Sequence, residues 1–340
     1  MTHLGPASSE EVCALGVSTL TWWVTLAVMA AFLTVDLWHS VRKPHVPQPR
    51  EAARHLLVYV GLAVLFGLLV WRTWGGEYAG EYYAGWLTEY SLSVDNLFVF
   101  LLIMQRFSVP AHLQQNALLA GILIAIVLRA VFIAAGAAAI QRFSWVFYVF
   151  GVFLIATSVK LAREGESDDD GYHENRLLQW VERKYRFTNE FVGTRLVAEI
   201  GGVRQLTAMA LVILSLGTTD LLFALDSIPA IYGLTNEPYL VLTANVFALM
   251  GLRQLYFLIG GLLKRLVYLS VGLAVLLAFI GVKLVLHALH ENELPFINGG
   301  RSVAVPQIPI AVSLGAIVTI LGVATVASLW RSNRDTQSLT

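Results

Sequence analysis

Cysteine and charged residues are both scarce in this sequence. Cys13 is the single cysteine, so an intrachain disulfide is excluded and a thiol redox role has little support. Charged residues make up 14% of the 340 residues, against about 25% in a typical soluble domain. Hydrophobic residues make up 57%. One soluble core cannot bury that much apolar side chain, whereas lipid can solvate it, so the sequence predicts a membrane protein.

Other absences exclude further classes. Residues 1–13 contain no Lys or Arg, so they lack the positively charged start of a signal peptide, and we expect the first apolar segment to be retained. No nucleotide-binding loop is present, which argues against ATP as a direct energy source. The formal net charge of +0 gives no support to a nucleic-acid partner, and we expect none. We also expect no enzymatic activity.

Long apolar runs fill most of the chain. A membrane-spanning helix needs about 20 mainly apolar residues. The sequence predicts nine such spans at 17–38, 56–74, 83–104, 115–138, 143–162, 206–231, 240–261, 266–288 and 307–330. The predicted fold is an all-α polytopic membrane protein with nine transmembrane helices, and residues 1–340 form a single transmembrane domain.

Lys and Arg gather in alternate connections and so predict the orientation. They are dense after spans one, three, five and seven and in the tail, for example at Arg42, Lys43, Arg106, Lys264 and Arg331. The N-terminus is therefore expected outside and the C-terminus in the cytoplasm of a bacterial cell membrane. The cytoplasmic connection at 163–205 contains an amphipathic stretch, which is either an interfacial helix or a partner-binding linker.

Two segments place carboxylates inside apolar sequence. TEYSLSVDNLFVF at 88–100 carries Glu89 and Asp95, and TDLLFALDSIPAIY at 219–232 carries Asp220 and Asp226, six residues apart in each case. Asn96 and Ser227 directly follow the second acid. A charged side chain at the bilayer centre costs about 2.5–3.5 kcal/mol even on the lenient insertion scale. Two matched pairs therefore indicate a path for cations.

The two acidic segments begin halves of similar composition. Each is followed by a span with an arginine, Arg129 or Arg253, and then by a span with a lysine, Lys160 or Lys283. Three helices are an odd number, so consecutive copies insert with opposite topology. The pattern predicts an inverted repeat of residues 83–162 and 206–288, an arrangement that places transport sites between the halves.

The ligand chemistry favours a hard cation. Carboxylate, amide and hydroxyl oxygens without cysteine or a nearby histidine suit Mg²⁺, Ca²⁺ or Mn²⁺. Pro229 has no N–H, so it frees the Leu225 carbonyl and is expected to unwind the helix locally. Lys160 and Lys283 are gating candidates, with snorkelling to the interface as the simpler alternative. Asn245 is either a packing residue or a ligand.

Helix geometry separates the acids of each pair. Six residues turn a helix by about 600°, which leaves the two acids about 120° apart and ~9 Å apart along the axis. We therefore assign Asp95 and Asp226 to the central ion, Glu89 to the outer path and Asp220 to the inner path. Arg129 and Arg253 would neutralise Glu89 and Asp220 respectively in the absence of metal. The remaining acid near the inner entrance is Asp36, either a guard of the path or a solvated interfacial group.

The motifs resemble the TerC/Alx family of integral membrane proteins. The matching segments are EYSLSVDNLFVF (89–100), DLLFALDSIPAIYGLT (220–235) and NVFALMGLRQLYFL (245–258). The resemblance implies an exporter of divalent cations, chiefly Mn²⁺. Its acidic and polar positions correspond here to Asp36, Glu89, Asp95, Asn96, Asp220, Asp226 and Ser227. Gly217 stands where the family often has an acid, a departure that bears on the metal preference.

The resulting hypothesis is a secondary transporter that exports Mn²⁺, with Ca²⁺ as an alternative ion. Exchange for protons would proceed by rocking one repeat against the other, with Arg129, Arg253 or a lysine as substitute cation. The alternative is a non-transporting membrane factor that assists insertion or folding of other membrane proteins through 163–205. A redox modulator ranks last because it would depend on Cys13.

Overall fold

The computed structural model describes residues 15–42, 48–143, 145–164, 187–188, 190–200, 203–259, 268–292, 294–295 and 297–337. Cys13, Lys43, Lys264, Arg265 and most of the predicted amphipathic stretch lie outside these residues. Within them, eight helical segments are long and apolar enough to cross a membrane, and a ninth helix has a shorter apolar run, Thr19–Val35. The prediction of an all-α polytopic membrane protein is confirmed.

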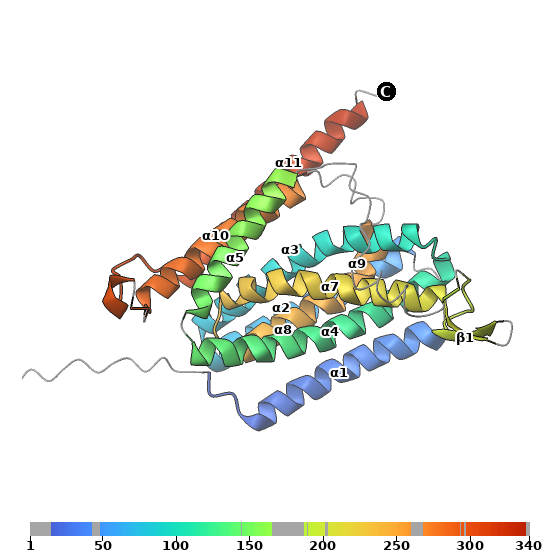
Figure 1. Cartoon of the computed structure of the whole chain (residues 1–340), viewed down its shortest axis with the longest axis horizontal. Coiled ribbons are helices and arrows are strands. Elements are labelled where there is room, and N and C mark those ends of the chain that lie inside the picture. The colour runs from blue at the N-terminus through green and yellow to red at the C-terminus, as the bar shows by residue number, and fades with distance from the viewer. Residues whose placement is uncertain are drawn as a thin grey trace, which may run out of the picture.

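Each of the nine predicted spans coincides with a helical segment (Figure 1). Span seven consists of two helices, α8 and α9, because the chain turns at Gly251. The helices are α1 (Thr19–Arg42), α2 (Pro49–Trp74), α3 (Gly76–Arg106), α4 (Ala111–Arg142), α5 (Val146–Glu164), α7 (Ala208–Tyr232), α8 (Pro238–Met250), α9 (Leu252–Ile259), α10 (Leu269–His290) and α11 (Ile310–Gln337). A 3₁₀ turn, η2 (Asn298–Gly300), lies between α10 and α11.

Local sequence sets several of the helix ends. Pro49 and Pro238 occupy the first turns of α2 and α8, where a missing N–H is not needed. The Thr207 side chain caps α7 by accepting a hydrogen bond from the Ala210 N–H. Gly75 has a φ of +101° and joins α2 to α3 without a loop, a conformation that favours glycine.

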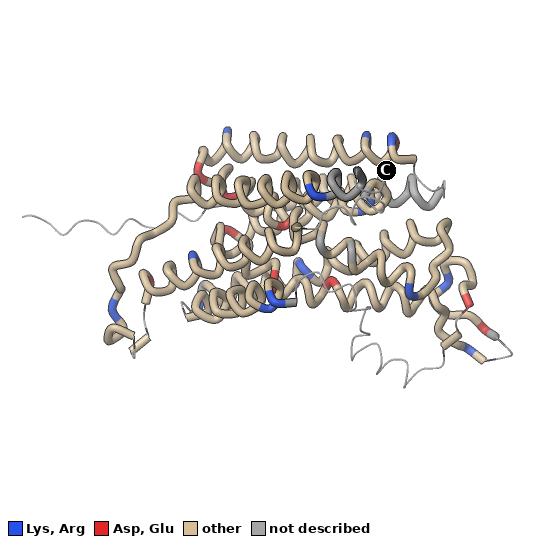
Figure 2. The backbone as a smooth tube through the Cα atoms, turned by 90° about the horizontal axis from the view of Figure 1, so that it is seen from above, with Lys and Arg blue, Asp and Glu red and all other residues tan. Residues whose placement is uncertain are grey.

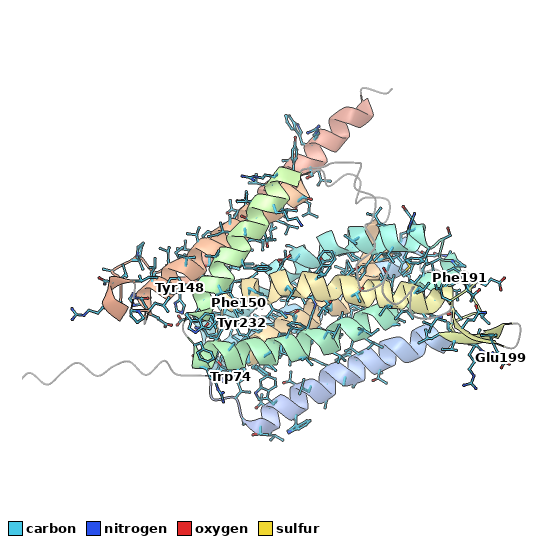
Figure 3. The ribbon with its side chains drawn as sticks, viewed as in Figure 1. Trp74, Tyr148, Phe150, Phe191, Glu199 and Tyr232 are labelled. Carbon is cyan, nitrogen blue, oxygen red and sulfur yellow. The ribbon has the colours of Figure 1, made fainter. Side chains whose placement is uncertain are left out.

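The two ends of the molecule carry different features. Strands β1 (Val197–Ile200) and β2 (Val203–Leu206) form an antiparallel hairpin just before α7. Figure 3 places Phe191 and Glu199 at this end, and Trp74, Tyr148 and Tyr232 at the opposite end. Trp74 ends α2, Tyr148 begins α5 and Tyr232 ends α7. Alternate connections therefore meet at the same end, as the predicted topology requires.

The helices form a bundle and a tilted group (Figure 1). Helices α1, α2, α3, α4, α7 and α8 lie side by side, whereas α5, α10 and α11 cross them obliquely. The backbone view in Figure 2 shows long stretches of helix without a charged residue, as lipid-facing helices require, together with a smaller number of charged residues near the middle of the molecule. The exposed apolar side chains of α1, α2 and α11 fit the same setting.

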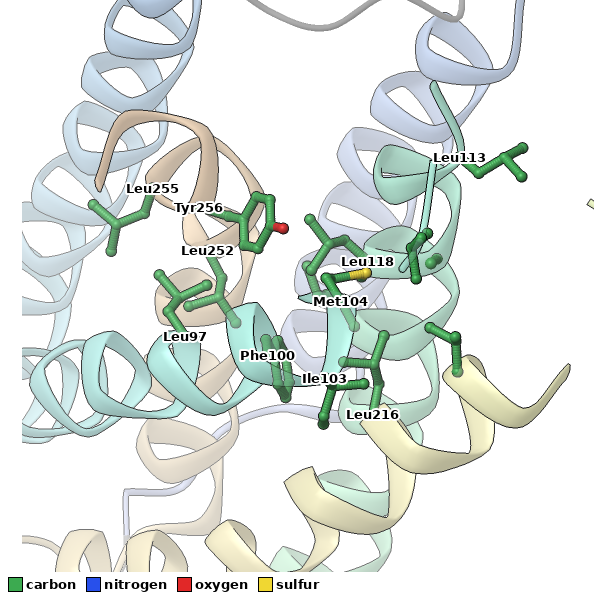
Figure 4. Packing of buried hydrophobic residues seen from close by; sticks show 14 of the residues in the cluster. Leu97, Phe100, Ile103, Met104, Leu113, Leu118, Leu216, Leu252, Leu255 and Tyr256 are labelled. Atoms are coloured by element: carbon green, nitrogen blue, oxygen red, sulfur yellow. The ribbon is translucent and has the colours of Figure 1, made fainter. Parts of the chain in front are cut away.

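The largest apolar cluster packs the second half of α3 against its neighbours (Figure 4). Leu97, Phe100 and Met104 of α3 are 0–1% exposed. They belong to one cluster with Leu118 of α4 and Leu252 of α9. This packing fixes α3 beside α4 and α7, and so sets where the acids of the two motifs meet.

The helix contacts have a reciprocal pattern. Helix α4 packs extensively on α7, and α8 packs to a similar extent on α3, while α5 packs on α10. An inverted repeat of α3–α5 and α7–α10 would give such contacts, and the repeat itself stays a prediction.

Candidate functional site

A buried arginine joins the first acid of each motif. Arg129 of α4 forms a bidentate contact with Asp220 of α7, from Nε to Oδ2 and from Nη2 to Oδ1, each at 3.1 Å. Its Nη1 also donates to Glu89 Oε1 of α3, to Ser227 Oγ at 3.0 Å and to Asn245 Oδ1 at 2.9 Å. These five side chains are each at most 1% exposed. Four helices therefore meet at one guanidinium.

The positions of Glu89 and Asp220 correct the predicted path. We expected Glu89 toward the outside and Asp220 toward the cytoplasm, each with its own arginine. The structure instead brings both acids to Arg129. The reason is the length of the helices: Glu89 is near the middle of α3 (Gly76–Arg106) and Asp220 is at the middle of α7 (Ala208–Tyr232). Two helices that pack along their length present their central residues to each other.

The cluster is closed rather than open to an ion. Arg129 directs hydrogen bonds to all four polar partners, and Ser93 Oγ donates to Glu89 Oε1 at 3.4 Å. The second oxygen of Glu89, Oε2, has no hydrogen-bond partner among the described atoms. Removing one partner of a buried ion pair costs about 3–5 kcal/mol. Arg129 is therefore the fixed counterion of Glu89 and Asp220 at the point where the four helices meet.

A separate cavity surrounds the second acid of the α7 motif. Its volume is about 210 Å³, and it lies between α3, α5, α7 and α10. Asn96 of α3, Thr157 and Lys160 of α5, and Asp226 of α7 supply its polar lining. Thr157 Oγ1 donates to Asp226 Oδ1 at 3.2 Å, and the Lys160 charge interacts with the Asp226 carboxylate. The apolar lining residues are Leu92, Leu161, Phe223, Leu273 and Leu277.

The cavity gathers some of the predicted ligands and not others. Asp226 and Asn96 line it, whereas Ser227 faces Arg129. The side chains of Asp95 and Asp36 lie outside the described residues. Among the described residues, no group of three or more His, Cys, Asp or Glu side chains is placed to hold a metal ion. The described oxygens available to a cation are therefore one carboxylate, one amide and one hydroxyl.

Arg253 and Pro229 differ from their predicted roles. Arg253 is 7% exposed and its Nε donates to Gln254 Oε1 at 3.5 Å, so Asp220 is held by Arg129 instead. Helix α7 continues through Pro229 to Tyr232, so the predicted unwinding is not observed. Pro229 lies in the last turn, where the Gly233 N–H donates to the Pro229 carbonyl at 3.0 Å and keeps the turn closed.

A third polar group lies near the other end of the tilted helices. Thr235 Oγ1 donates to Glu81 Oε2 at 2.6 Å, and the Lys283 charge interacts with Glu81. Glu77 and Glu237 add negative charge around Glu81. Lys283 was a sequence candidate, whereas Glu81 was not, because it was counted among the charges of a loop. Thr157 was also missed, although it is one turn before Lys160 on the same helix face.

The chain resembles known membrane proteins over most of its length. The description "Integral membrane protein TerC family" matches residues 74–336. An uncharacterized membrane protein of Mycobacterium tuberculosis is 46% identical over 95% of this chain and 82% of its own length. An uncharacterized membrane protein of Myxococcus xanthus is 38% identical over 92% of both chains. The protein of Escherichia coli named "Putative membrane-bound redox modulator Alx" is 37% identical over 93% of this chain and 96% of its own.

No solved structure matches the chain. The family match covers all helices from α3 to α11 and both acidic motifs. The chain therefore belongs to the TerC family of integral membrane proteins, with several membrane-spanning helices.

Proposed function

We propose that the chain is a secondary transporter that exports divalent cations from the cytoplasm, chiefly Mn²⁺ and to a lesser extent Ca²⁺, in exchange for protons. The cavity between α3, α5, α7 and α10 carries this proposal. Its polar lining offers the oxygens of Asp226, Asn96 and Thr157, which are ligands of hard cations. A carboxylate next to a cavity among membrane helices is also a candidate functional residue by default.

The size of the cavity suits a partly hydrated ion. A volume of about 210 Å³ has room for several water molecules. Ions such as Mg²⁺ give up their water reluctantly and are bound by one or two carboxylates together with water. A site with few protein ligands also binds weakly, and a transporter must release its ion. Asp226 is therefore proposed as the central ligand.

Lys160 is the proposed exchangeable cation. A divalent ion at Asp226 would repel the Lys160 ammonium. Two such charges about 5 Å apart repel each other by about 2–7 kcal/mol, for an effective dielectric constant between about 80 and 20. Lys160 is exposed on one side and its long side chain can turn away from the cavity. Arg129 is fixed by its buried partners, so we no longer propose that it swings between states.

The orientation of this exporter is part of the proposal. Lys and Arg are frequent at the end of the molecule that carries the β1–β2 hairpin, for example Arg195 and Arg204. Positive charge marks the cytoplasmic side of bacterial membrane proteins. We therefore place the hairpin end and the C-terminus in the cytoplasm, with the N-terminus outside the cell membrane.

The name of the Escherichia coli relative refers to redox modulation. A thiol mechanism in this chain would depend on Cys13, the single cysteine. A cation carrier whose protons couple to metal needs no thiol. The cavity chemistry thus favours transport over redox exchange.

Uptake of Mn²⁺ into proteoliposomes tests the proposal. Wild type should show uptake that depends on a pH gradient, and a dye inside the vesicles should report proton movement in the opposite direction. Asp226→Asn keeps the shape of the side chain but removes its charge, so uptake should fall to the background of empty vesicles. Thr157→Val should retain uptake at a higher half-saturating Mn²⁺ concentration.

Glu199→Gln is the matched control. It removes a carboxylate that is exposed on strand β1, and it should transport like wild type. Equal background signals in wild type and Asp226→Asn would contradict the proposal. They would favour the alternative hypothesis, a non-transporting factor that assists the insertion of membrane proteins. Deleting residues 165–186 would then abolish activity, whereas Asp226→Asn would not.

A further inference from the structure

The buried cluster around Arg129 contains more acids than bases. Glu89 and Asp220 both bind Arg129, and among the described residues these two are the charged groups that interact with Arg129. Ser227 and Asn245 complete the contacts of the guanidinium and carry no charge. With both acids ionised, one negative charge would lack a counterion in a cluster whose members are at most 1% exposed. Such a charge is costly to bury, so the cluster needs one further positive charge.

The contacts of the two acids decide which one can take up a proton. Arg129 occupies both oxygens of Asp220, with Nε on Oδ2 and Nη2 on Oδ1, each at 3.1 Å. Glu89 Oε1 accepts from Arg129 Nη1 and from Ser93 Oγ, whereas Glu89 Oε2 is buried and has no hydrogen-bond partner among the described atoms. A proton on Glu89 Oε2 leaves all of these contacts in place, and a neutral O–H without an acceptor costs far less than an unpaired charge.

One residue of α7 joins this cluster to the cation cavity. Asp226 lines the cavity, and the next residue, Ser227, accepts a hydrogen bond on its Oγ from Arg129 Nη1 at 3.0 Å. Glu89 Oε1 accepts from the same nitrogen, so these two oxygens lie within two hydrogen-bond lengths of each other. Adjacent Cα atoms are about 3.8 Å apart. A cation bound at Asp226 is therefore within electrostatic reach of Glu89.

We propose that Glu89 carries the proton that is exchanged for the metal ion: Oε2 is protonated while no cation is bound, and the proton passes to water when a divalent cation binds at Asp226. The inference rests on the proposed function and names the proton site of that exchange. The incoming cation supplies the positive charge that the cluster lacks, so it favours the ionised form of Glu89. Because coupling between two binding events is reciprocal, protonation of Glu89 weakens metal binding by the same factor.

Proton release on metal binding tests this assignment. Purified protein in detergent is titrated with Mn²⁺ in weakly buffered solution, and a pH indicator counts the protons released per ion bound. Wild type should release about one proton more than Glu89→Gln, because glutamine has the shape of the protonated acid and cannot ionise. The Kd for Mn²⁺ should therefore fall more steeply with rising pH in wild type than in Glu89→Gln, by up to about tenfold per pH unit. The control Glu199→Gln, which removes an exposed carboxylate of β1, should behave like wild type.

Infrared difference spectroscopy examines the wild-type protein directly. Adding Mn²⁺ should remove the carbonyl stretch of a protonated carboxylic acid and increase the carboxylate absorption. This change should be absent from Glu89→Gln and retained in Glu199→Gln. Equal proton release in wild type and Glu89→Gln, or an infrared change that persists in Glu89→Gln, would overturn the inference. So would a Glu89→Gln variant that fails to fold, because the neutral side chain should leave Arg129 and Asp220 as a matched pair.

Transport assays separate this inference from the proposed function. In proteoliposomes, Glu89→Gln should still exchange radioactive Mn²⁺ between equal concentrations on both sides, while the stimulation of uptake by a pH gradient should fall about fivefold or more. Gradient-driven uptake that is the same in wild type and Glu89→Gln would leave transport intact and refute Glu89 as the proton site. A protonated-acid absorption that titrates with pH and is absent from Glu89→Gln, together with no Mn²⁺ uptake in wild type, would keep the buried proton site and refute the metal transport.

Discussion

The cluster around Arg129 gives the sharpest prediction on stability. In Arg129→Met, a side chain of similar length and no charge leaves Glu89 and Asp220 without their cation. Both carboxylates are at most 1% exposed, so water does not replace the lost partner. Breaking a buried ion pair by removing one member costs about 3–5 kcal/mol. Because two acids lose the same partner here, we expect the free energy of unfolding to fall by at least about 4 kcal/mol.

Removing all three charges should undo most of that loss. Buried ion groups can often be replaced by neutral residues of similar volume with little loss. The triple variant Glu89→Gln/Arg129→Met/Asp220→Asn should therefore unfold within about 2 kcal/mol of wild type. The difference in the free energy of unfolding between the single and triple variants measures the cost of burying two carboxylates without their cation. Both variants contain Arg129→Met, so a change in packing at residue 129 alone would not separate them.

Reversible unfolding in mixed micelles of dodecyl sulfate and a mild detergent provides the assay, with the nine tryptophans as the fluorescent signal. Arg72→Met is the control, because Arg72 is exposed in the last turn of α2 and should change stability by less than about 0.5 kcal/mol. A loss below about 1 kcal/mol in Arg129→Met would refute the buried counterion, since one lost pair alone costs more. A triple variant as unstable as the single one would refute it as well.

Three further variants test individual contacts of the fold. Gly281→Leu places a Cβ against a main-chain oxygen of α5 and should lower the free energy of unfolding by about 1–3 kcal/mol or more. The control Gly322→Leu, at a position with open space around it, should leave the free energy of unfolding unchanged. Pro229→Ala should keep Mn²⁺ uptake within about twofold of wild type, because α7 is already continuous there. Loss of uptake would instead support the expectation that Pro229 unwinds the helix for transport. Tyr232→Phe removes a 2.7 Å hydrogen bond to a main-chain carbonyl of α4 and should cost about 1 kcal/mol in the same unfolding assay; an unchanged midpoint would contradict it.

Hydropathy alone was enough to place the spans. Runs of about 20 apolar residues have few alternatives to a membrane helix. Each predicted run coincides with one helix, except span seven, which contains α8 and α9. The acidic motifs were also located correctly inside α3 and α7. These features depend on local composition, so one sequence is sufficient to find them.

The start of α3 could not be read from hydropathy. The predicted span began at residue 83, whereas the helix begins at Gly76. Residues 77–82 include two glutamates and lower the local hydropathy, yet Ala79 and Tyr82 are at most 5% exposed. They pack against other helices rather than lipid. This extra length moves Glu89 from the first third of the helix to its middle, opposite Asp220.

Pairing between distant helices was the other limit. The sequence shows two acids and two arginines without showing which ones meet. Our assignment of Arg253 to Asp220 followed from the depth at which each residue was expected in the membrane. In the structure Arg129 reaches both acids because α4 packs along α7. A choice between partners depends on which helices lie side by side, and that is a property of the whole fold.

The spacing within the α7 motif explains how one helix serves two purposes. Asp220 is locked to Arg129, while Asp226 faces the cavity and Thr157. Six residues rotate a side chain by about 120° from its starting direction and move it ~9 Å along the axis. A spacing of seven would return Asp226 to nearly the same face, where the buried arginine would compete for it. The motif on α7 thus separates a structural carboxylate from an accessible one, and Asn96 of α3 lines the same cavity as Asp226.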